Sequence, residues 1–209
     1  MARRRRRVLV IEAIPRSQKF DEGEMLRHFL DLVFENDRDR VHYYRVKGKS
    51  QLINYIDQKK DLSRYGFIHL SAHGKPEIGA LELPKGYLYP GDLRQGCFKG
   101  RVLTLSACST GRKEFVADLI ERTGADAVIA PKADVWFSSA GLWFANFYYL
   151  VLDMGYSPRN ACRRVNLMLH GQVKGGFRYY DRRSVESIIE GRSWRSFFAG
   201  GNGNGKRRK

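Results

Sequence analysis

The chain has 209 residues, of which 43% are hydrophobic and 29% are charged, and its formal net charge is +16. These values fit one globular domain that can bury a substantial core. They exclude a typical membrane protein, because no run of about 18 or more apolar residues occurs.

The chain begins with a basic stretch that we expect to be disordered over residues 1–6. Only the short apolar run from Val8 to Ile11 follows before Glu12 interrupts it. This run is too short for the core of a signal peptide, so we expect a cytoplasmic protein. At the other end, a Gly/Asn-rich basic tail over 199–209 is expected to be flexible.

Much of the net charge sits in these two ends. Arg3 to Arg7 supply five positive charges and residues 206–209 supply four, so removing these nine from +16 leaves +7 for the rest of the chain. Such ends can make weak, non-specific and salt-dependent contacts with the phosphates of nucleic acid. The simpler interpretation is that they only aid solubility.

Between the ends, the first half of the chain alternates apolar strands with amphipathic helices. The continuous apolar run within 7–14 predicts a buried strand, and further strands are expected over 41–46 and 67–72. Apolar residues at helical spacing predict helices over 21–35 and 50–59.

The second half continues this alternation after a glycine- and proline-rich passage that holds a small expected hairpin, formed by 79–83 and 87–88. The other expected elements are strands over 101–107 and 127–130, helices over 112–122, 138–154, 158–170 and 184–190, and a loop over 171–176. Strands that alternate with helices imply an α/β three-layer sandwich with a mostly parallel central sheet, in a single domain over 7–198.

Two chemically active residues directly follow buried strands of this predicted sheet. His73 stands in the motif LSAHG at 70–74, and Cys108 stands 35 residues later in the motif LSACSTG at 105–111. In parallel sheets the chemistry collects beyond the carboxyl ends of the strands. If the two strands are neighbours, an imidazole and a thiol face each other, and the imidazole can generate the nucleophilic thiolate.

Neighbouring residues favour the same chemistry. Cys108 opens the turn into the helix expected from Arg112, and the positive end of a helix dipole would favour a thiolate. Gly74 allows a close backbone approach, so the amides of Gly74 and Cys108 could stabilise a tetrahedral oxyanion. Cys97 and Cys162 form no Cys-x-x-Cys pair, and we interpret both as structural residues, with no disulfide framework, metal or cofactor implied.

The two motifs resemble the catalytic blocks of CHAT-type peptidases, a clan CD family of cysteine peptidases related to caspases and separases. The resemblance covers about 67–165 and includes the motif TGADAVIAP at 123–131. It implies a caspase-like sandwich and hydrolysis of peptide bonds in protein substrates by His73 and Cys108, and enzymes of this kind can need an activating protein partner. Ser106 stands where caspases have glutamine, which argues against cleavage after aspartate.

Acidic residues suggest which substrates such an enzyme would select. By resemblance to separase-like enzymes, Asp134 is the candidate that would pair with a substrate Arg or Lys, with Trp136 as an apolar wall. Glu12 is a second candidate for substrate binding and Asp92 a third. Arg16 could reach the same region and would favour an acidic substrate instead. We hypothesise a cysteine endopeptidase that cleaves after Arg or Lys.

Three other functions stay open at this point. A catalytically silent caspase-like module would bind a partner without turnover. A nucleic-acid-binding protein would use the basic ends, and the tyrosine pairs at 43–44, 148–149 and 179–180 could stack on bases, although packing explains the first two pairs better. A glutamine amidotransferase also combines a strand-end cysteine with a histidine, but there the cysteine precedes the histidine in the chain.

Overall fold

The computed structural model describes residues 7–15, 17, 21–34, 39–58 and 62–199, the last eight of these by their backbone only. The expected basic N-terminus (1–6), most of the expected tail (200–209) and Arg16 lie outside the described residues.

The central sheet contains six strands: β1 (Val8–Glu12), β2 (Val41–Arg45), β3 (Phe67–Ser71), β7 (Val102–Ser106), β8 (Ala127–Pro131) and β9 (Phe177–Asp181). Their order is β2-β1-β3-β7-β8-β9. The first five are parallel to their neighbours, and β9 pairs antiparallel with β8. Every residue of β1, β3 and β8 is buried, which is the pattern of a parallel sheet covered on both faces.

A second sheet of three short strands lies at the carboxyl end of β3. It consists of β4 (His73–Lys75), β5 (Ala80–Glu82) and β6 (Tyr87–Leu88), all antiparallel. The hairpin expected from the sequence is therefore confirmed as β5 and β6. Its third strand, β4, was not expected, because three residues with glycine at the centre carry no strand pattern.

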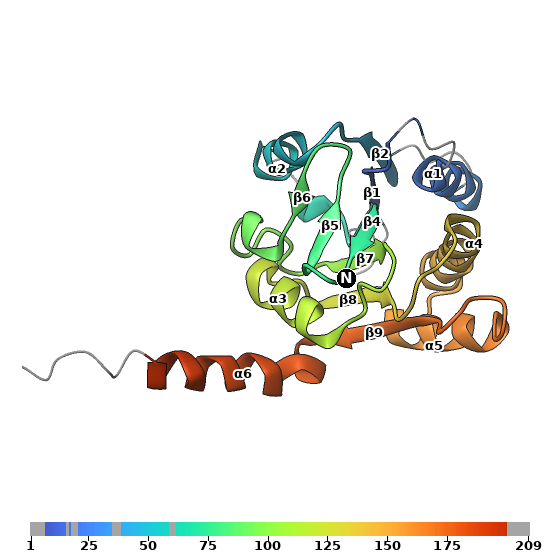
Figure 1. The fold of residues 1–209 in the computed structure, drawn as a ribbon. Helices are drawn as coiled ribbons and strands as arrows, with labels where there is room; N and C mark the ends of the chain where they lie inside the picture. Colours follow the sequence, from blue (N-terminus) through green and yellow to red (C-terminus); the bar gives the residue numbers. More distant parts are fainter. Residues whose placement is uncertain (1–6, 16, 18–20, 35–38, 59–61, 200–209) are drawn as a thin grey trace, which may run out of the picture.

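Helices cover both faces of the central sheet (Figure 1). On one face lie α1 (Glu22–Val33), α4 (Phe137–Tyr148) and α5 (Pro158–Met168), and on the other lie α2 (Lys49–Gln58), α3 (Lys113–Thr123) and the start of α6 (Arg182–Ala199). Short helical turns complete the elements: η2 (Leu62–Arg64), η3 (Pro90–Asp92) and η4 (Tyr149–Asp153). No helix of the described part of the chain is long and apolar enough to cross a membrane.

The two faces of the sheet bury different cores. Aliphatic side chains dominate between the sheet and α2 and α3. Aromatic side chains dominate on the α4 side, where Trp143 is fully buried and stacks on Phe147 at 5.4 Å and on Phe177 at 4.2 Å between ring centroids. Stacked and edge-on rings add to the free energy of burial, so this cluster fixes α4 and β9 to one another.

Several element boundaries differ from those expected. The helix expected over 138–154 is α4 followed by the π-helical turn η4, and the short helix expected over 184–190 is the longer α6. Strand β9 was missed because Phe177–Asp181 has only a weak alternation of buried and exposed residues. Its strand conformation depends on pairing with β8. Gly124 ends α3 as expected, in the left-handed conformation with φ 67°.

Candidate active site

The register of β3 and β7 brings His73 and Cys108 to the same edge of the sheet. Ser71 pairs with Ser106 at the ends of these neighbouring parallel strands, and His73 and Cys108 each follow two residues later. The Ala72 amide donates to the Ser106 carbonyl at 3.1 Å, which continues the pairing beyond the strands. The two sequence motifs are therefore adjacent in space, as their strand-end positions predicted.

The backbone of Gly74 lies directly against that of Cys108. A Cβ atom placed on Gly74 would stand 1.8 Å from the Cys108 carbonyl oxygen and 3.0 Å from its amide nitrogen. No side chain fits at this position without moving one of the two segments, because non-bonded carbon and oxygen atoms do not approach so closely. The glycine after His73 is thus required by the proximity of the two motifs.

The turn that carries Cys108 is tied to the end of β8. The Gly111 amide donates to the Pro131 carbonyl at 2.8 Å, and the Ser109 amide donates to the Ala133 carbonyl at 3.2 Å. Tyr180 of β9 adds a bond from its hydroxyl to the Gly111 carbonyl at 2.6 Å. These bonds hold Ser109 in a left-handed conformation with φ 54°, which is uncommon outside glycine.

The Cys108 thiol is partly buried and lies beside the chain that follows β8. Its Sγ donates to the Val135 carbonyl oxygen at 3.4 Å. Helix α3 begins only at Lys113, after a four-residue turn, whereas the field of a helix dipole acts mainly within the first turn. This separation weakens the expected contribution of the helix N-terminus to the thiolate.

His73 is half-buried and begins β4. Its ring packs edge-on against Phe137 at 5.3 Å between centroids, and its register partner on β5 is Glu82. Burial lowers the pKa of the His73 imidazole below 6.5; Lys75 lowers it further, and Glu82 acts in the opposite direction. The imidazole is therefore mostly neutral at pH 7, which is the form that can accept a proton.

A pocket of about 530 Å³ opens beside Cys108. Its lining residues are Gly74, Lys75, Pro76, Glu77, Cys108, Asp134, Val135, Trp136 and Lys174. Asp134 is exposed at this pocket and accepts a hydrogen bond from the Ser109 hydroxyl at 2.7 Å. Trp136 is 82% exposed, so its ring lies at the open side of the pocket and is not buried in its wall.

Glu12 is not part of this pocket, and its assignment as a substrate-binding residue needs correction. It is the last residue of β1, and its side chain is fully buried under the start of α1, where the Gly23 amide donates to Oε2 at 2.6 Å. Burial, together with the nearby Glu22 carboxylate, raises the pKa of Glu12 to about 7. Asp92 is engaged elsewhere too, since it accepts hydrogen bonds from Lys49 and the Tyr89 amide.

A buried polar network lies beneath the site on the same face as Glu12. His69 Nδ1 is 3.1 Å from Thr104 Oγ1, and His69 Nε2 is 3.5 Å from a Glu22 carboxylate oxygen. Thr104 Oγ1 is also 2.8 Å from the Tyr148 hydroxyl, whose pKa burial raises. His69 and His73 therefore have different surroundings. The sequence indicated that His69 is buried but not its partners, which come from distant segments.

The remaining cysteines are buried and do not approach the site. Burial raises the pKa of the Cys97 thiol to about 11 and that of Cys162 to about 12, which keeps both protonated. None of the three cysteines forms a disulfide. Within the described ranges, no group of three or more His, Cys, Asp and Glu side chains is arranged to hold a metal ion.

Comparison with known proteins identifies the fold. No family model and no curated protein matches the sequence. A secreted C11 cysteine protease from Bacteroides thetaiotaomicron, in complex with an irreversible peptide inhibitor, superposes with a TM-score of 0.55 at 12% identity, over 89% of this chain and 68% of that one. An inactive zymogen C11 protease from Parabacteroides distasonis gives 0.56 at 9% identity, over 88% and 63%. Caspase-1 from Spodoptera frugiperda gives 0.43 at 14% identity, over 85% and 87%.

These matches confirm the predicted fold class. The chain has the caspase-like α/β fold of the C11 proteases, with a mostly parallel central sheet between two layers of helices. It spans about two thirds of the length of the two C11 chains. The similarity at 9–12% identity establishes the fold alone, and membership of the CHAT family stays a resemblance.

The Gly74 contact generates a first prediction. Gly74→Ala should lower the free energy of unfolding by about 1–3 kcal/mol, because the new methyl group must displace the Cys108 turn. It should also change the rate at which iodoacetamide alkylates Cys108. Gly91→Ala is the matched control, since a Cβ atom there meets open space. Denaturant unfolding that shows equal stability for the two variants would contradict the contact.

The buried carboxyl of Glu12 generates a second prediction. Its pKa in the folded protein is about 7, above the ordinary value of 4.5, so the folded state retains the Glu12 proton between these pH values. The stability that this bound proton contributes to the folded state is fully present below about pH 4.5 and is lost as the pH rises through about 7. Glu12→Gln should therefore gain stability relative to the wild type with rising pH, with a slope of at most about 1.4 kcal/mol per pH unit.

The measurement is denaturant unfolding from pH 5 to pH 8. The exposed Glu121→Gln serves as the control, because it removes the same charge without a buried environment. Parallel stability curves for the wild type and Glu12→Gln would show that Glu12 ionises normally in the folded protein.

Proposed function

We propose that the chain is a cysteine endopeptidase that hydrolyses peptide bonds of protein substrates, with Cys108 as nucleophile and His73 as general base. The observation that carries this proposal is the direct contact of the Gly74 backbone with the Cys108 carbonyl, at the ends of neighbouring parallel strands. The caspase-like fold supports it, because C11 cysteine proteases have the same architecture.

The reaction follows from the chemistry of the pair. Neutral His73 takes the thiol proton of Cys108, and the thiolate sulfur attacks the carbonyl carbon of the scissile bond. The resulting oxyanion collapses as the C–N bond breaks, and the imidazolium of His73 donates its proton to the leaving amine. The acyl group remains on Cys108 as a thioester. His73 then deprotonates water, which attacks the thioester and releases the carboxylic acid and the thiol.

The oxyanion is assigned to the backbone amides of Cys108 and Gly74. The described residues provide no hydrogen-bond acceptor for the Cys108 amide, so this donor can serve a substrate oxygen. Backbone donors held by the surrounding fold are effective here, because they need no reorganisation as the charge develops. The bonds that tie Ser109 and Gly111 to the end of β8 would keep this donor in place.

For the substrate residue before the cleaved bond, we propose Arg or Lys. Asp134 is the carboxylate that supports this preference, because the Ser109 hydroxyl next to Cys108 holds it at the edge of the pocket. The exposed ring of Trp136 would cover the aliphatic part of a long basic side chain. Three cysteines without a disulfide favour the reducing cytoplasm, and a protein partner is the proposed activator.

Loss of the two proposed catalytic groups gives a third prediction. Cys108→Ala should abolish cleavage of protein and peptide substrates and labelling by a thiol-reactive peptide probe. His73→Ala should lower kcat/KM by about 10²- to 10⁴-fold, which is the usual contribution of a general base. The measurements are a fluorogenic peptide assay and mass spectrometry of the labelled protein.

Two matched variants control for nonspecific damage. Cys97→Ala removes a buried thiol and His28→Ala removes an exposed imidazole, and both should retain activity. Undiminished probe labelling of Cys108→Ala would exclude Cys108 as the nucleophile. Tight binding of a protein partner without turnover, unaffected by Cys108→Ala, would favour a silent interaction module.

The proposed role of Asp134 gives a fourth prediction. Asp134→Asn should reduce kcat/KM for substrates with Arg or Lys before the cleaved bond by about fivefold, a modest effect because the carboxylate is exposed. Glu77→Gln removes a second carboxylate from the same pocket and should have a smaller effect. The measurement is a peptide-library profile, and a preference for Asp or for apolar residues at this position would refute the assignment.

A further inference from the structure

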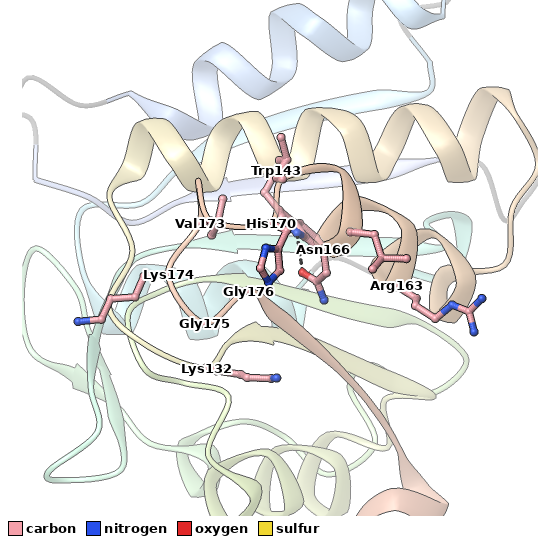
Figure 2. A pocket seen from close by; sticks show the side chains of 12 residues that line it. Lys132, Trp143, Arg163, Asn166, His170, Val173, Lys174, Gly175 and Gly176 are labelled. Carbon is pink, nitrogen blue, oxygen red and sulfur yellow. Dashed lines mark hydrogen bonds between the residues drawn. The ribbon is translucent and has the colours of Figure 1, made fainter.

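A second pocket, of about 520 Å³, has the lining residue Lys174 in common with the Cys108 pocket. Figure 2 shows this second pocket from close by. It is enclosed by the end of β8, by α4 and α5, and by the loop before β9. Neither the LSAHG motif nor the LSACSTG motif contributes to its lining. The sequence predicted the loop over 171–176 but did not indicate a binding site there.

The charges around this pocket are all positive. Lys132, Arg163 and Lys174 line it from different segments of the chain, and in Figure 2 the Lys174 and Arg163 side chains extend toward opposite sides of it. Its lining contains no Asp or Glu. Among the described residues, none of these three cations forms an ion pair with a carboxylate. Three uncompensated cations around one cavity favour an anionic ligand.

Three part-buried hydrogen bonds of the Asn166 side chain join the segments that line the pocket. Asn166 accepts from the Trp143 indole Nε1 at 3.0 Å and from the Phe177 amide at 3.0 Å, and it donates to the Phe177 carbonyl at 2.6 Å. This one side chain therefore fastens α5 to α4 and to β9. Gly175 and Gly176 both have positive φ, and a Cβ on Gly176 would stand 2.9 Å from the Asn166 oxygen. The loop is thus shaped around Asn166, and the positions of the cations depend on it.

The two pockets share one lining residue, and neighbouring residues of one chain segment line both. Lys174 lines both. Lys132 lines the basic pocket and Asp134 lines the Cys108 pocket, and these two residues lie at most about 7 Å apart along the chain. Ala133, between them, accepts the hydrogen bond from the Ser109 amide. A substrate strand could therefore span both pockets within a few residues.

We propose that the basic pocket binds the carboxylate side chain of an Asp or Glu residue of the protein substrate whose scissile bond lies at Cys108. The inference rests on the proposed peptidase function and adds a second requirement to it. Lys132, Arg163 and Lys174 supply the positive potential, and Leu167 and Val173 supply apolar surface for the methylene groups of the acidic residue. The substrate class is then a segment with an acidic residue close to the cleavage site.

The test compares two series of internally quenched peptides that start from one cleaved sequence. At each position on either side of the cleaved bond, one series carries Glu and the other carries Gln. The full-length protein should prefer Glu at one position by about three- to tenfold in kcat/KM, as expected for a partly exposed ion pair with several cations. The preference should decrease as ionic strength rises from about 0.05 M to about 0.5 M.

Variants then locate the preference. The double variant Lys132→Gln, Lys174→Gln should reduce the Glu-to-Gln ratio to about one, and Lys132→Glu, Lys174→Glu should favour a Lys peptide over its Gln counterpart, by reversal of the charge. Lys99→Gln, at the opposite edge of the sheet, is the control for the loss of one positive charge and should retain the preference for Glu. Using a ratio within each variant separates selection from any change in overall activity.

The outcomes separate the two proposals. If Cys108 reacts with a peptide probe and the peptides are cleaved without any preference for Glu, the pocket inference is wrong and the peptidase function stands. A preference for Glu that survives both double variants also overturns the inference. If Cys108 is neither labelled nor required for cleavage, the peptidase function fails and the substrate role of the pocket fails with it. Competition by inorganic phosphate against Glu and Gln peptides alike would assign the pocket to a free anion and overturn it as well.

Discussion

The contact between the Gly74 backbone and the Cys108 carbonyl is the constraint on which the site depends. It exists because β3 and β7 are neighbouring parallel strands in a register that pairs Ser71 with Ser106. A shift of one residue would send each following side chain to the other face of the sheet. The pairing, the glycine and the turn bonds to β8 therefore act together, and each keeps an imidazole and a thiol at the same edge.

The support beneath this edge is polar and buried, which is costly unless the groups satisfy one another. On the α1 face, Glu12 caps the start of the helix through the Gly23 amide, and His69 joins Glu22 to Thr104 and Tyr148. Burial, together with the neighbouring Glu22 carboxylate, raises the pKa of Glu12. The strands that carry the site thus rest on a buried carboxyl group, that of Glu12, whose charge depends on pH, although Glu12 does not line the Cys108 pocket.

The segment after β8 connects the catalytic proposal to substrate selection. It gives an acceptor to the Cys108 thiol at Val135, an acceptor to the Ser109 amide at Ala133, and one charged residue to each pocket. Lys132 and Asp134 place a positive and a negative charge close together in one segment. This arrangement suits a substrate that carries both a basic and an acidic side chain. A site of this kind recognises two charged residues of a short substrate segment. It therefore discriminates between substrates better than one ion pair between exposed groups does.

The sequence by itself determined the alternation of most strands and helices, the fold class, and the positions of His73 and Cys108 at strand ends, because these depend on neighbours along the chain. It could not place Glu12, whose strand-end position resembled that of the other candidates until α1 covered it. It also missed β4 and β9, since both take their conformation from a partner strand. Only the tertiary structure made Lys132, Arg163 and Lys174 line one cavity, because the part-buried hydrogen bonds of Asn166 join segments that lie far apart in sequence.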